Sequence, residues 1–127
     1  MNITEGERLL LIQKKEEIRT ITQEIIEIVN KESTTRQDIT EVKKKFLHVL
    51  SLLHILASYG SPNRDLQSLM MNIIQIIGME LRVANSIVLK ANIEITCIVV
   101  NSITFSFSPW PTLIKLSIPP LSAEVQK

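Results

Sequence analysis

Apolar residues recur at heptad spacing in the first thirty positions of the chain. Leu11, Ile18 and Ile25 are seven residues apart, and Ile21 and Ile28 each follow three residues after one of them. This spacing predicts a helix with a narrow apolar seam, as in one strand of a coiled coil or bundle.

The start of this helix has its own signal. Thr4 and Glu7 match the capping box, in which a hydroxyl and a carboxylate satisfy free backbone N–H groups reciprocally. We therefore expect a coiled-coil-like helix that begins near Thr4, within an N-terminal unit of residues 1–34.

A polar stretch separates this helix from a second amphipathic segment. Residues 30–38 contain no apolar side chain, and Thr34 with Gln37 offers a second capping box. The pattern predicts a break near residues 31–34 and then a new helix. One continuous helix is the competing interpretation, because the stretch contains neither Gly nor Pro.

Beyond the break, apolar residues alternate by three and four and then spread over a wider face. The regular positions are Ile39, Val42, Phe46, Val49, Leu53 and Leu56. Gly60 and Pro62 should end this helix, and a third helix is predicted over about residues 62–93, with Gly78 marking a bend. The short connection makes these two helices an antiparallel hairpin, residues 35–94.

The sequence changes character after Glu94. Residues 95–100 are rich in β-branched side chains, residues 103–108 alternate with period two, and prolines follow. The predicted fold is therefore all-α: a coiled-coil-like N-terminal helix, a helical hairpin, and an irregular or weakly β-prone tail over residues 95–127 that stands apart from the folded module.

The tail also contains twenty consecutive positions without charge, residues 95–114. Their length fits a membrane span, whereas Asn101 and the Pro109-Trp110-Pro111 sequence lower the tendency to insert. A small membrane-associated protein anchored by this segment is thus the alternative to a protein that acts through its helices.

Composition narrows the function classes. The 127 residues fit one domain, the net charge of +1 provides no field that attracts nucleic acid, and a single cysteine excludes an internal disulfide. The N-terminus places charges before its short apolar run, the reverse of a secretory signal, so we expect an intracellular protein in the cytoplasm or nucleus.

Candidate catalytic and metal-binding residues are few. His48 and His54 are six apart and fall on different sides of a helix, and Cys97 has no base beside it in sequence, which favours an inert cysteine. Lys43, Lys44 and Lys45 fit a solvated helix face. We expect no enzyme, no cofactor, no metal, no small-molecule substrate and no nucleic-acid partner.

The function that remains is binding to another protein. We expect a non-enzymatic scaffold or assembly subunit whose apolar seams bind a helical partner or a second copy by knobs-into-holes packing. The residues expected to bind the partner are Leu11, Ile18, Ile21, Ile25, Ile28, Phe46, Val49 and Leu53. For Phe46, Val49 and Leu53, burial in the core of the same chain is an equally weighted interpretation.

Overall fold

The described part of the chain is all-helical. The computed structural model describes residues 4–59, 64–79 and 87–106. Four helices hold 88% of these residues and none of them lies in a strand, which confirms the predicted all-α class. The helices are α1 (Glu5–Val29), α2 (Arg36–Ala57), α3 (Arg64–Ile77) and α4 (Ile87–Ser106).

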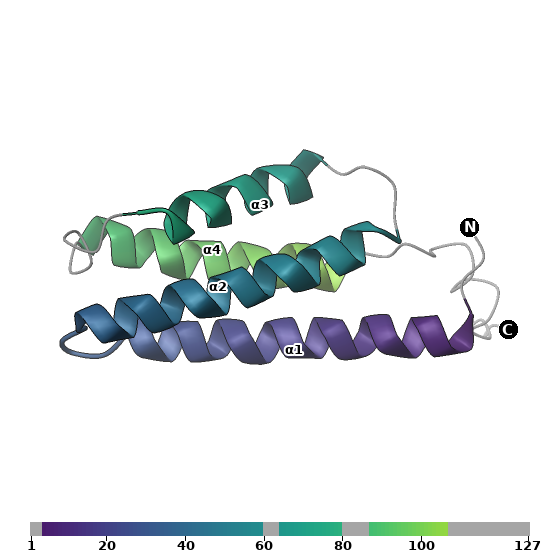
Figure 1. Cartoon of the computed structure of the whole chain (residues 1–127), viewed down its shortest axis with the longest axis horizontal. Coiled ribbons are helices and arrows are strands. Elements are labelled where there is room, and N and C mark those ends of the chain that lie inside the picture. Colours follow the sequence, from purple (N-terminus) through teal and green to yellow (C-terminus); the bar gives the residue numbers. More distant parts are fainter. Residues whose placement is uncertain (1–3, 60–63, 80–86, 107–127) are drawn as a thin grey trace, which may run out of the picture.

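The four helices form an elongated bundle. Figure 1 shows successive helices running in opposite directions, with α4 returning alongside α1. α1 contacts α2 and α4, and α3 contacts the same two helices, so the contacts close a ring. Each helix therefore turns one face to the interior and leaves an outer face that the other described helices do not cover.

The cap predicted at Thr4 and Glu7 exists, whereas the cap predicted at Thr34 and Gln37 is replaced by one that begins one residue later. At α1, Thr4 Oγ1 accepts from the Glu7 backbone N–H at 3.1 Å, and the Glu7 carboxylate accepts from that of Thr4 at 3.0 Å. At α2, Thr35 and Asp38 form the cap instead of Thr34 and Gln37.

The displacement has an electrostatic reason. The Asp38 carboxylate accepts from the Thr35 backbone N–H and from Lys31, each at 2.9 Å. These two interactions lower the pKa of Asp38, the backbone hydrogen bond contributing most. A carboxylate near a helix N-terminus is a stronger acceptor than the glutamine amide that the sequence pattern suggested.

The core lies where the seams of α1 and α2 meet the inner faces of α3 and α4. Phe46 is its largest fully buried side chain. The same core cluster includes aliphatic residues from all four helices, among them Leu11, Ile18, Ile25, Val49, Leu53, Ile73, Ile93 and Val100.

The third helix is shorter than predicted. α3 ends at Ile77, not near residue 93, and the chain turns at Gly78 and Met79. Glycine destabilises the interior of a helix, which favours a helix end near Gly78. Lys43 of α2 donates a hydrogen bond to the Met79 backbone carbonyl, so a neighbouring helix satisfies this acceptor in the turn.

The prediction of an irregular or β-prone segment is wrong for residues 95–106, which belong to α4. Local β-preference is overridden because Ile93, Cys97 and Val100 are completely buried against the rest of the bundle. The remainder of the predicted tail, residues 107–127, lies outside the described residues, as do residues 60–63 and 80–86.

Candidate functional site

The structure places the eight predicted partner-binding residues inside the bundle. Seven are buried and Ile28 is half-buried against the same core. In the structure the seams pack against each other within the chain, so the intramolecular interpretation given for Phe46, Val49 and Leu53 also describes α1. The physical reason is proximity: two seams joined by a short connection meet each other at a high effective concentration.

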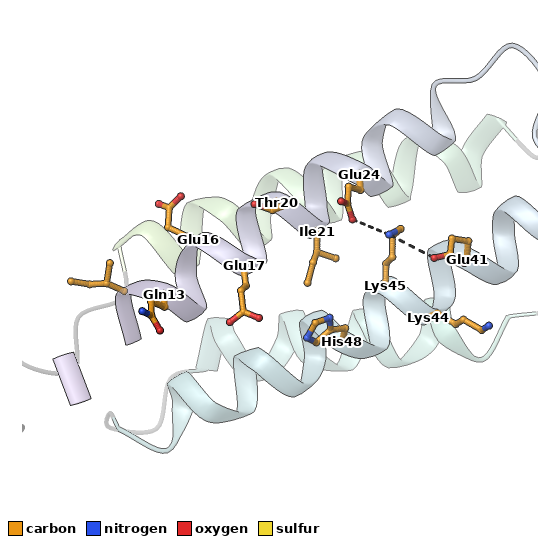
Figure 2. A pocket seen from close by; sticks show the side chains of 11 residues that line it. Gln13, Glu16, Glu17, Thr20, Ile21, Glu24, Glu41, Lys44, Lys45 and His48 are labelled. Atoms are coloured by element: carbon orange, nitrogen blue, oxygen red, sulfur yellow. Dashed lines mark hydrogen bonds and ion pairs between the residues drawn. The ribbon is translucent and has the colours of Figure 1, made fainter. Parts of the chain in front are cut away.

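An open groove of about 830 Å³ runs along the outer junction of α1 and α2. Figure 2 shows Glu17 and Ile21 of α1 pointing toward α2, where His48, Lys45 and Lys44 lie. Carboxylates line the α1 side, and the α2 side has two lysines together with Glu41, so the groove has charges of both signs.

An ion-pair cluster crosses this groove. Lys45 Nζ lies 2.8 Å from the Glu24 carboxylate and 3.6 Å from that of Glu41. The hydrogen bond with Glu24 is the main cause of a raised pKa for Lys45. Such a partly exposed pair contributes up to about 1 kcal/mol. The cluster therefore helps to hold α1 against α2.

The three consecutive lysines do not act as one basic patch. Lys45 pairs with glutamates, Lys43 donates to the Met79 carbonyl, and Lys44 lines the groove. A phosphate-binding site needs converging cations, and here two of the three are engaged elsewhere.

The candidate nucleophile and metal ligands are dispersed. Cys97 is buried, and burial, with a smaller contribution from the Glu94 carboxylate, raises the pKa of its thiol to about 12. The thiol is therefore neutral near pH 7. His48 and His54 are exposed, and within the described ranges no three His, Cys, Asp or Glu side chains gather as a metal would require.

The outer face of α4 is the most unusual surface of the bundle. Ile87 is 84% exposed, Ile98 61% and Phe105 91%, while Thr96 and Thr104 are buried. The exposed residues of α4 are all uncharged: Ile87, Val88, Ala91, Asn92, Ile95, Ile98, Val99, Ser102 and Phe105. The helix thus turns apolar residues to the surface and several polar ones to the interior.

Two hydrogen bonds fix α4 in this rotation. Asn101 Nδ2 donates to Thr22 Oγ1 of α1 at 2.8 Å, and Asn72 Nδ2 of α3 donates to Thr96 Oγ1 at 2.8 Å. Turning the apolar face inward would break both bonds and leave Asn72 of α3 and the buried Thr22 hydroxyl of α1 without their α4 partners. The sequence signal for this face was a three-four spacing from Val88 to Phe105, which the β-branched composition concealed.

Thr104 provides a test of how α4 packs. Its hydroxyl is buried and has no hydrogen-bond partner in the described part of the chain. Thr104→Val, which keeps the shape and removes the hydroxyl, should raise the free energy of unfolding by about 1 kcal/mol in urea titrations. Thr22→Val, which removes the acceptor of Asn101, should instead lower it. A valine at 104 that destabilises the protein would contradict this packing.

Among the described helices, α4 alone is long and apolar enough to cross a membrane. The stretch is Ile87–Phe105, and only 28% of it is buried within the bundle. The bundle core therefore does not account for its apolar character.

Comparison with known protein families, with curated proteins and with solved structures finds no match to this chain. Its function has to be argued from its own surfaces.

Proposed function

We propose that this protein is a non-enzymatic, intracellular assembly subunit: a coiled-coil-like helix and a helical hairpin completed by α4, acting by contact with another protein surface. The observation that carries the proposal is the uncharged outer face of α4. Because the seams of α1 and α2 are buried within the chain, the contact is assigned to α4 and not to the residues first expected.

The area of this face supports the proposal. Its six large apolar side chains are Ile87, Val88, Ile95, Ile98, Val99 and Phe105. At on the order of 100 Å² each, they expose about 600 Å², as large as the largest apolar patch of a typical monomer. Patches of this size are characteristic of interaction sites.

The contrast with α1 adds to the argument. The outer surface of α1 carries ion pairs between Arg8 and Glu5 and between Lys14 and Glu17. A surface of that kind is suited to water, whereas the α4 face leaves apolar area in contact with water until another surface covers it.

Site-specific photo-crosslinking in expressing cells tests the proposal. A photoreactive amino acid at position 98, in the α4 face, should give covalent adducts with protein. The same amino acid at position 47 is the control, because Leu47 of α2 is similarly exposed at 56% but lies outside the α4 face. Absence of protein adducts at position 98, or equal adducts at both positions, would refute the proposed function.

A membrane-associated protein is the second candidate, and the Ile87–Phe105 stretch favours it. It differs from the anchor first predicted, residues 95–114, because the apolar helix begins eight positions earlier. In this case position 98 should crosslink to lipid, and the protein should stay in the membrane fraction after alkaline carbonate extraction. Protein adducts and a soluble fraction would exclude it.

A further inference from the structure

We propose that the α4 face binds the α4 face of a second copy of this chain, with the two helices antiparallel. This inference rests on the proposed function and names its partner. The contact residues are Val88, Ala91, Ile95, Ile98, Ser102 and Phe105.

The spacing of these residues is that of a coiled-coil seam. From Val88 onward they are separated by three, four, three, four and three residues, and all six are exposed. Such alternation keeps one stripe facing a partner helix along about 26 Å. Unlike the seams of α1 and α2, this one has no covering helix in the described part of the chain.

Large and small side chains follow the same order along the seam whether it is read from its N-terminal or its C-terminal end. When two antiparallel copies are centred between Thr96 and Cys97, Val88 faces Phe105 of the second copy, Ala91 faces Ser102, and Ile95 faces Ile98. Small residues meet small ones between layers of larger ones. This complementarity suits a two-fold contact, in which the same patch serves both chains.

The charged residues of α4 itself do not oppose this pairing. Lys90 and Glu94 are the charged residues of α4, and both are half-buried. Glu94 flanks the seam, and in the centred register it lies beside Asn101 of the second copy. Like charges therefore do not meet there. The net charge of +1 per chain also gives little repulsion between copies.

The area is sufficient for a dimer. Covering the whole uncharged face, with Ile87 and Val99 as well as the seam, buries about 600 Å² on each copy and roughly 1,200 Å² in total, the lower end of the range for stable protein interfaces. A lipid surface is less well matched, because stable binding to anionic membranes adds basic flanks, whereas the exposed positions of α4 carry no lysine or arginine.

The first test is the mass of the purified full-length protein in solution. Sedimentation at micromolar concentration should give twice 14.4 kDa. Ile98→Glu should weaken the dimer roughly 100-fold, because it places a carboxylate in two symmetry-related layers. The matched control, Leu47→Glu, adds the same charge at a comparably exposed residue of α2 and should leave the dimer intact. Circular dichroism should show that both variants stay helical.

Cysteine crosslinking tests the orientation. Ala91→Cys and Ser102→Cys proteins, mixed and mildly oxidised, should form disulfides between positions 91 and 102, and neither variant should crosslink efficiently to itself. Cys97 is buried and serves as an internal unreactive thiol. Efficient 91–91 or 102–102 crosslinks would overturn the antiparallel arrangement.

The outcomes separate this inference from the proposed function. A monomeric full-length protein, or a dimer that Ile98→Glu leaves unchanged, overturns self-association through α4. If the purified protein is monomeric while position 98 crosslinks to a different protein in cells, the inference fails and the proposed function stands. If position 98 gives no protein adduct in cells, the proposed function itself fails.

Discussion

Phe46→Ala is expected to lower the free energy of unfolding by about 3–5 kcal/mol. Phe46 is completely buried in the middle of α2 and is the largest side chain of the core. Its removal takes away apolar burial and leaves a cavity that the neighbouring aliphatic residues cannot fill. Small domains have only about 5–15 kcal/mol of stability, so this loss is a large fraction of the total.

Urea denaturation followed by far-ultraviolet circular dichroism measures this effect. The matched control is Leu47→Ala at the next position, because Leu47 is 56% exposed and its truncation should change stability by no more than about 0.5 kcal/mol. Equal losses at positions 46 and 47 would show that α2 does not present the face assigned to it.

Val100→Asp should destabilise the bundle by at least about 3 kcal/mol. Val100 is fully buried on the inner side of α4, so aspartate at this position introduces a charge without a partner in the core. The prediction tests whether α4 belongs to the folded unit, since a tail that stands apart from the helices would tolerate the substitution.

Two further variants make this result specific. Asn92→Asp adds the same charge at an exposed position of α4 and should leave thermal unfolding nearly unchanged. Val100→Thr keeps the shape of valine and should fall between the two. If the Val100→Asp variant unfolds at the wild-type temperature, the result would contradict the packing of α4 against α1 and α3.

The first two helices could be predicted from local signals. The cap at Thr4 and the isoleucine spacing of α1 are short-range features, and so is the polar break before α2. They are readable because cap chemistry and heptad spacing act within a few residues. The displaced cap at Thr35 shows the limit of this reasoning, since Lys31 favours Asp38 only once the loop has formed.

α4 could not be predicted in the same way. Its β-branched residues favour strands locally, and packing against α1 and α3 stabilises them in a helix. Hydrogen bonds such as that between Asn101 and Thr22 join residues 79 positions apart, and no local pattern indicates such a pair. The groove ion pair between Glu24 and Lys45 depends in the same way on how α1 and α2 pack.

Which surface covers each apolar seam also could not be predicted from the sequence. Spacing shows that Leu11, Ile18 and Phe46 need cover, but the identity of the covering surface depends on topology. The seam on α4, which no other described helix covers, carries the same three-four alternation as the seams of α1 and α2.

The ring of helix contacts has a consequence for synthesis of the protein on the ribosome. α1 meets α2 soon after both have been made, whereas its contact with α4 waits until Asn101 has been translated. At roughly 5–20 residues per second, the 79 positions between Thr22 and Asn101 take about 4–16 s. During that interval the nascent chain lacks the α4 contact of α1, and we expect it to bind chaperones that recognise exposed apolar segments.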